Sequence, residues 1–137
     1  VMADGVFYVI ELAPRLSGGL LCSHIIPASY GVDFMGKAID SAVGKRSLPV
    51  GENSKAVEVS QRYFFPDPEW IDKKIASMPP VDDDSNFTYH AYVKPGDKVK
   101  PVTYHGARLG QVICSGPSAR KRCEKIVSDL EKEIVVE

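Results

Sequence analysis

The chain has 137 residues, a formal net charge of -1 and 26% charged residues, as is typical of one soluble globular domain. The near-neutral charge excludes a strongly basic nucleic-acid surface, because phosphate contacts need a surplus of Lys and Arg. No apolar run approaches the ~20 residues that span a bilayer, and the N-terminus lacks the pattern of a secretion signal. We therefore predict a cytoplasmic protein with neither a nucleic-acid nor a membrane partner. The first residue is Val, which indicates a piece of a longer chain.

The first third of the chain predicts one strand and two helices. Residues 5–10 form a continuous run of apolar, β-branched and aromatic side chains, which is typical of a buried strand. A helical segment is expected over residues 20–29. Asp33 is a good N-cap for a second helix, because the apolar residues after it recur at helical spacing. We expect this helix to end at Gly44.

The remaining two thirds predict an antiparallel group of strands and one long helix. The predicted strands cover residues 56–65, 87–93, 98–104, 109–114 and 134–136, and the second and third of them form a hairpin across residues 94–97. A short helix is expected to carry Trp70 and Ile75. The last helix has a clear apolar face and is expected to be capped by Ser118. Isolated helices beside an antiparallel group of strands predict the α+β class.

The three cysteines are an odd number, lie far apart and form no Cys-x-x-Cys pair. This pattern argues against both a disulfide framework and a zinc site. We expect Cys114 and Cys123 to be reduced core residues. Cys22 is expected to be structural too, with a nucleophilic role as the alternative.

The candidate metal-binding and anion-binding residues follow the first predicted strand. Glu11 and Arg15 lie four residues apart, ahead of the pair Gly18 and Gly19. A carboxylate is a hard oxygen ligand suited to magnesium, and a guanidinium offers two parallel donors to a phosphoryl or carboxylate group. The glycines let backbone N–H groups approach an anion. The alternative for these residues is an ordinary ion pair followed by a turn.

Two stretches resemble the ATP-grasp superfamily of carboxylate-amine ligases. Residues 8–15 (YVIELAPR), followed by residues 31–34 (GVDF), resemble the end of its catalytic domain, where a strand carries a metal-binding Glu-x-Asn-x-Arg motif. Residues 108–113 and the helix after them resemble the C-terminal subdomain of the branch that includes L-amino-acid ligases and carnosine-synthase-like enzymes. The resemblance implies an α+β fold in which residues 1–54 end an ATP-grasp domain. Residues 55–137 would then form a small antiparallel β-rich subdomain with flanking helices.

The same resemblance implies roles for individual residues. Glu11 would be a ligand of the magnesium ion that bridges the ATP phosphates. Arg15 would be the catalytic residue that binds the transferred phosphoryl group, and it would form the cofactor site together with Gly18 and Gly19. Ala13 stands where the family has Asn, which removes one oxygen ligand.

The function that the resemblance implies is that of a C-terminal ligase fragment. ATP and magnesium would activate a small carboxylate as an acyl phosphate, which an amine then attacks. The family's nucleotide-binding lysines and glycine-rich loop precede the matched motif, so we expect a missing N-terminal half as the partner and no activity from the isolated chain. A homodimer through the apolar edge at residues 6–10 is an additional possibility.

Two alternatives stay open at this point. The first is an ATP-grasp enzyme fragment of the carboxylase or carbamoyl-phosphate-synthase type. The second is a non-catalytic binding module, because residues 93–99 (VKPGDKV) are similar to a turn of biotinyl and lipoyl carrier domains.

Overall fold

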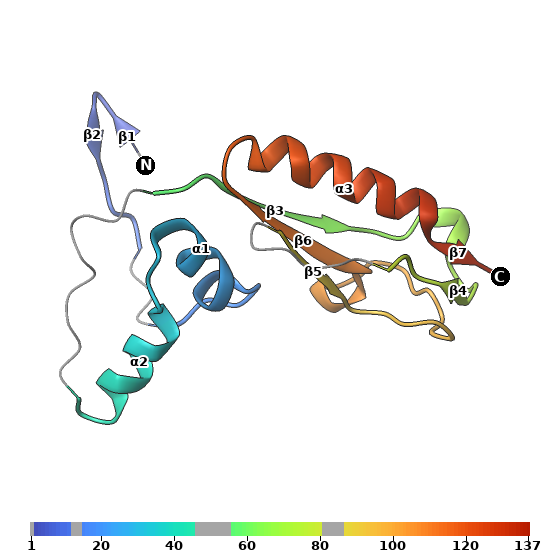
Figure 1. The fold of residues 1–137 in the computed structure, drawn as a ribbon, viewed down its shortest axis with the longest axis horizontal. Helices are drawn as coiled ribbons and strands as arrows, with labels where there is room; N and C mark the ends of the chain where they lie inside the picture. Colours follow the sequence, from blue (N-terminus) through green and yellow to red (C-terminus); the bar gives the residue numbers. More distant parts are fainter. Residues whose placement is uncertain (1, 12–14, 46–55, 81–86) are drawn as a thin grey trace.

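The computed structural model describes residues 2–11, 15–45, 56–80 and 87–137. Helices and antiparallel strands form two groups, one from each end of the chain (Figure 1). This arrangement confirms the α+β class. None of the helices in these four ranges has the length and apolarity that crossing a membrane requires.

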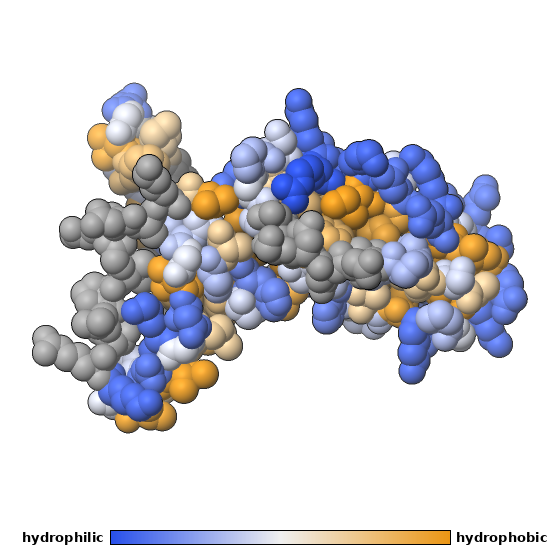
Figure 2. Space-filling view, viewed as in Figure 1, coloured by the Kyte–Doolittle hydropathy of each residue, from blue (hydrophilic) through white to orange (hydrophobic). Residues whose placement is uncertain are grey.

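The N-terminal group begins with an exposed hairpin. β1 (Met2–Ala3) pairs antiparallel with β2 (Val6–Phe7). The prediction of a buried strand over residues 5–10 is wrong, because the side chains of Phe7 and Ile10 are 81% and 78% exposed. Figure 2 shows apolar residues on the surface of this hairpin. A two-stranded ribbon has too few neighbours to cover both of its faces.

Helical segments complete the N-terminal group. They are a π-helical turn η1 (Leu21–Ile25), α1 (Ile26–Tyr30) and α2 (Phe34–Ala42). The first two segments confirm the helix expected over residues 20–29, and they end at Gly31 with φ +66°. The predicted cap of α2 is also confirmed, since Asp33 Oδ1 accepts from the Gly36 amide at 2.8 Å. The chain leaves α2 through Gly44, at φ +77°.

The C-terminal group is built on a three-stranded antiparallel sheet. Its strands are β3 (Val59–Phe64), β5 (Phe87–Ala91) and β6 (Gly110–Ser115), in the order β3-β6-β5. All three were predicted as strands. The predicted hairpin between residues 87–93 and 98–104 is wrong, because β5 pairs with β6, with Phe87 opposite Cys114.

The segment after β5 still turns where the sequence indicates. The Asp97 amide donates to the Lys94 carbonyl at 3.0 Å. The chain then passes beside residues 73–75, where the Val99 amide donates to the Lys73 carbonyl at 2.8 Å. Val99 is only 2% exposed. Burial of this side chain against a different neighbour replaces the expected hairpin, and a short 3-10 turn, η3 (His105–Ala107), follows.

A second small sheet closes the far end of this group. β4 (Ile75–Ser77) pairs antiparallel with β7 (Val135–Val136), which confirms the final predicted strand. Ile75 therefore lies in a strand and not in the short helix expected there. Only a 3-10 turn, η2 (Pro68–Trp70), forms, and Asp67 accepts a hydrogen bond from the Glu69 amide at its start.

The long helix α3 (Ala119–Glu133) covers one face of the main sheet (Figure 1). Its polar side chains face outward above the apolar layer beneath it (Figure 2). The core lies between helix and sheet and includes the fully buried Phe64, Val112, Cys114 and Cys123. Cys22, Cys114 and Cys123 are all buried and free, so the expected burial of these side chains is confirmed.

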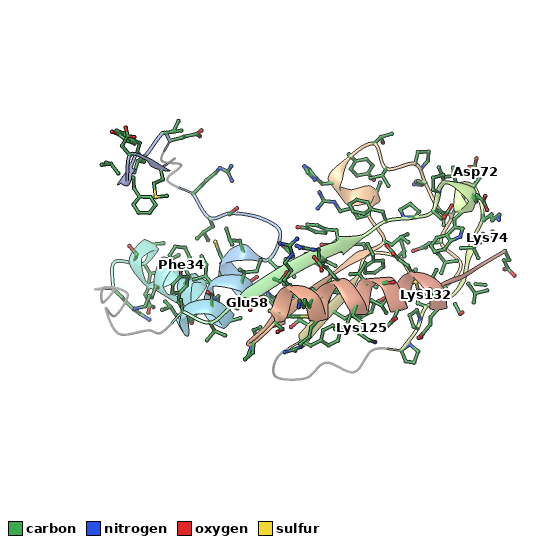
Figure 3. The ribbon with its side chains drawn as sticks, turned by 90° about the horizontal axis from the view of Figure 1, so that it is seen from above. Phe34, Glu58, Asp72, Lys74, Lys125 and Lys132 are labelled. Carbon is green, nitrogen blue, oxygen red and sulfur yellow. The ribbon has the colours of Figure 1, made fainter. Side chains whose placement is uncertain are left out.

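The start of α3 is capped by a residue that lies just before β3. Ser118 adopts a left-handed conformation at φ +58° and makes no side-chain cap hydrogen bond, so the expected Ser118 cap is wrong. A capping side chain normally belongs to a residue with extended backbone. Here Glu58 Oε1 accepts from the Arg120 amide at 3.1 Å instead. Figure 3 shows Glu58 at this end of α3, while Lys132 lies near the other end of the helix.

Candidate functional site

A cavity of about 910 Å³ lies where the glycine loop of the N-terminal group meets the main sheet. Its volume is within the range of small-molecule sites. The side chains that shape it come from β3, from β5 and the residue after it, and from the segment before β6. The residues that matter for its chemistry are Gly18, Gly19, Tyr63, His90, Tyr92 and Arg108, with His105 beside them.

The glycine loop is fastened to the sheet by hydrogen bonds. Gln61 Nε2 donates to the Gly19 carbonyl at 2.8 Å and also to the side chain of the buried Gln111. A Cβ atom on Gly19 would lie 3.1 Å from Tyr63 Oη, and this glycine has φ +67°. A side chain at residue 19 would therefore crowd the Tyr63 hydroxyl, and the backbone conformation of this residue favours glycine.

A second contact holds the two groups of elements together. The Val57 amide donates to the Ser29 carbonyl at 2.8 Å, and Ser29 Oγ donates to the Val57 carbonyl at 3.0 Å. The loop and the sheet are thus joined on both sides of the helical turn that follows Gly19, so the cavity wall is a defined part of the fold.

Arg108 supplies the permanent positive charge of the cavity. Its guanidinium carbon lies 3.8 Å from the centroid of the Tyr63 ring, a cation–π contact. Its Nη2 also contacts His105 Nδ1. Because arginine only donates, Nδ1 accepts this hydrogen bond and the ring proton of a neutral His105 lies on Nε2. Among the described residues, no carboxylate forms an ion pair with Arg108.

The opposite wall carries two more rings. His90 and Tyr92 meet edge to face with ring centroids 5.3 Å apart. Burial raises the pKa of the Tyr92 hydroxyl, and the neighbouring Tyr63 raises this pKa further, while Arg108 opposes both effects. Tyr92 therefore remains a neutral hydrogen-bond donor near neutral pH.

The charge pattern of the cavity favours anions. None of the described residues that line it is Asp or Glu, whereas Arg108 and two histidines contribute to its walls. An arginine held by a ring and a histidine presents its remaining N–H groups in a fixed fork, which matches the geometry of a carboxylate or phosphate.

The predicted site residues fall into two sets. Gly18 and Gly19 line this cavity. Glu11 and Arg15 are exposed, do not line it and form no ion pair with each other. The structure thus places neither of these two side chains in the cavity wall. Ala13 lies outside the described residues.

The predicted magnesium site is not complete in the described part of the chain. No group of three or more His, Cys, Asp or Glu side chains there is arranged to hold a metal ion. Glu11 alone offers fewer oxygen ligands than magnesium takes from protein, substrate and water together.

Sequence reasoning missed most of the cavity wall. His90 and Tyr92 lie two residues apart at the end of a predicted strand. Side chains at this spacing share one face of a strand, so the sequence could have predicted that these two rings lie together. Tyr63 and Arg108 are brought together only by the pairing of β3 with β6. Comparison of the chain with protein-family models and with curated proteins finds no match, so the chemistry of the cavity is the basis for assigning a function.

Proposed function

We propose that this chain is the C-terminal portion of an ATP-dependent carboxylate-amine ligase. Such an enzyme activates a carboxylate as an acyl phosphate, which an amine then attacks. The observation that carries the proposal is the cationic cavity beside the Gly18–Gly19 loop, with Arg108 as its fixed charge and no acidic side chain among its described lining residues. A site of this kind suits one of the two substrates, the carboxylate, and disfavours the amine.

The proposal assigns residues 1–54 to the end of an ATP-grasp domain and residues 55–137 to a β-rich subdomain. Arg15 binds the transferred phosphoryl group, and Glu11 supplies one magnesium ligand, the others coming from the preceding half of the enzyme. The exposure of Glu11 and of Arg15 supports this division, because both side chains are accessible to another part of the protein. The three free thiols support a cytoplasmic location.

The exposed residues before Glu11 also support a missing half. Val9 and Ile10 are 75% and 78% exposed, and an apolar run of this kind is normally covered on both faces when it forms a strand. In the proposal, the N-terminal half of the enzyme covers it. When that half is absent, the same edge is expected to favour a homodimer, so the isolated chain should sediment with a doubled mass.

The test is an assay of ADP formation by the protein that includes the coding sequence preceding Val1. We expect ADP to form only when a carboxylic acid and an amine are both supplied, and to be lost in Arg15→Ala. Arg120→Gln, on the exposed face of α3, is the matched control and should keep the activity. No ADP formation with any such pair overturns the proposal.

The alternatives predict different results in the same assay. ADP formation that requires bicarbonate indicates a carboxylase or carbamoyl-phosphate-synthase type of enzyme. A covalent biotinyl or lipoyl group, seen as added mass, indicates a carrier module. The hairpin that favoured this carrier alternative is not formed, since β5 pairs with β6 and not with residues 98–104. The isolated chain should form no ADP at all.

A further inference from the structure

The cavity beside Gly19 is lined largely by rings. Tyr63, His90, Tyr92 and His105 all contribute to its walls, together with Arg108. Planar rings favour an aromatic ligand, because aromatic pairs gain from offset-stacked or edge-to-face contacts beyond the area they bury. His90 and Tyr92 also contact one another edge to face, so two of these rings lie side by side in the wall.

The positive charge of the cavity has a fixed position. The Arg108 guanidinium is stacked on Tyr63 and donates to His105. These two contacts reduce the freedom that the side chain loses when it binds a ligand, so its other N–H groups are prepared to form two parallel hydrogen bonds with a carboxylate. Because none of the described lining residues is acidic, the ammonium group of an amine ligand would find no carboxylate partner in the cavity.

One part of the cavity wall depends on the absence of a side chain at Gly19. Gly19 is held against Tyr63 by the hydrogen bond from Gln61. A Cβ atom at position 19 would lie 3.1 Å from Tyr63 Oη, so the hydroxyl or the loop would have to move. Alanine at this position is therefore expected to move the Tyr63 hydroxyl or the loop by a few tenths of an ångström.

We propose that this cavity binds an aromatic carboxylic acid, with the ring between the aromatic walls and the carboxylate on Arg108. As a statement about the substrate, this rests on the proposed function, since it assigns the cavity to the carboxylate that the ligase activates. As a statement about binding, it applies to the isolated chain and is tested there.

The test compares four small probes by their dissociation constants, measured by chemical-shift titration of the isolated chain. The probes are 3-phenylpropionate, 3-cyclohexylpropionate, 3-phenylpropan-1-amine and inorganic phosphate. We expect 3-phenylpropionate to bind most tightly and the saturated analogue to bind about threefold to tenfold more weakly, since the ring contact contributes beyond area. The amine should bind more weakly still. Inorganic phosphate that binds as tightly as 3-phenylpropionate overturns the proposal, because the rings then contribute nothing.

Variants locate the binding. Arg108→Gln should weaken binding of 3-phenylpropionate about tenfold or more, because a charge-assisted contact is lost. Arg108→Lys should restore only part of it, since lysine lacks the planar fork. Tyr63→Leu should weaken binding of the aromatic acid more than that of its saturated analogue. The matched control is Arg120→Gln, which removes an exposed arginine on α3 and should leave all affinities unchanged.

The results separate this proposal from the ligase assignment. Equal affinity for the amine and the carboxylate, or for the saturated and the aromatic acid, overturns the aromatic-acid proposal even if a variant fails to fold, because these comparisons use the unmodified chain. ADP formation with purely aliphatic acids would then leave the ligase assignment in place. If 3-phenylpropionate binds selectively but the complete protein has no ligase activity, the proposed binding site is supported and the proposed ligase function is rejected.

Discussion

Gly110 is the first residue of the central strand β6, and replacing it with alanine tests how tightly the sheet is packed. It lies opposite Phe64 on β3 and Ala91 on β5. A Cβ atom at this position would lie 2.5 Å from the His90 carbonyl oxygen, and it would also meet the tip of the Phe64 ring. The ring belongs to a residue with no exposed surface, so neither neighbour can give way without moving the sheet.

The size of the effect follows from what must move. Overpacking a well-packed interior typically costs ~1–3 kcal/mol, and we expect about 3 kcal/mol for Gly110→Ala because one displaced group is backbone. With an unfolding entropy of ~2.1 cal/mol/K per residue, the 137 residues give about 290 cal/mol/K. The expected decrease in Tm is therefore about 10 °C.

Differential scanning calorimetry of the isolated chain measures this decrease. Gly18→Ala is the matched control, because a Cβ atom at Gly18 meets nothing within 4 Å, and its Tm should change by less than about 2 °C. A Tm of Gly110→Ala within about 2 °C of the unmodified chain would refute the close packing of β6 against Phe64.

The remaining predictions concern the surface charges and the proposed active site. Hydrogen bonds from Arg120 and Arg62 lower the pKa of Glu124, so this carboxylate stabilises the fold at neutral pH and the stabilisation is lost as pH falls through the lowered value. Glu124→Gln should therefore lower the urea midpoint at pH 7, by a margin that shrinks below the ordinary glutamate pKa of ~4.3; a constant margin contradicts this. In the complete enzyme, Arg15→Lys should reduce kcat roughly a hundredfold, about 3 kcal/mol, with little change in ATP affinity. Glu11→Gln should raise the magnesium concentration needed for half-maximal rate, and an unchanged magnesium titration removes its role as a ligand.

Local signals predicted the elements that local chemistry determines. The cap of α2 depends on one side chain and an amide three residues later, Asp33 and Gly36, so its sequence pattern is sufficient. The apolar face of α3 likewise repeats within one segment. The cap of α3 could not be predicted in this way. Glu58 accepts the hydrogen bond from the Arg120 amide in the first turn, and these two residues are 62 positions apart in the sequence.

The partners of the strands and the wall of the cavity depend on distant contacts. Residues 87–93 and 98–104 have good turn chemistry between them, yet β5 pairs with β6 because Val99 is buried elsewhere. The glycine pair was identified from its sequence, whereas Arg108 became a candidate only once β6 placed it against Tyr63. Secondary-structure propensity predicts the conformation of one segment, but it does not predict which segments come together to form a binding site.

The central position of β6 determines when the sheet can form during synthesis. β3 and β5 each pair with β6 and not with one another. A ribosome that has made the chain only as far as residue 109 has therefore produced two strands with no shared ladder. Residues 110–115 must pair with both β3 and β5 to form the sheet. Only then can α3 cover the face of that sheet. The loop between β3 and β6 has to close before the sheet gains its hydrogen bonds, which makes folding of this half slow and late relative to translation. Until then, the apolar faces of β3 and β5 are open to chaperones and to other nascent chains.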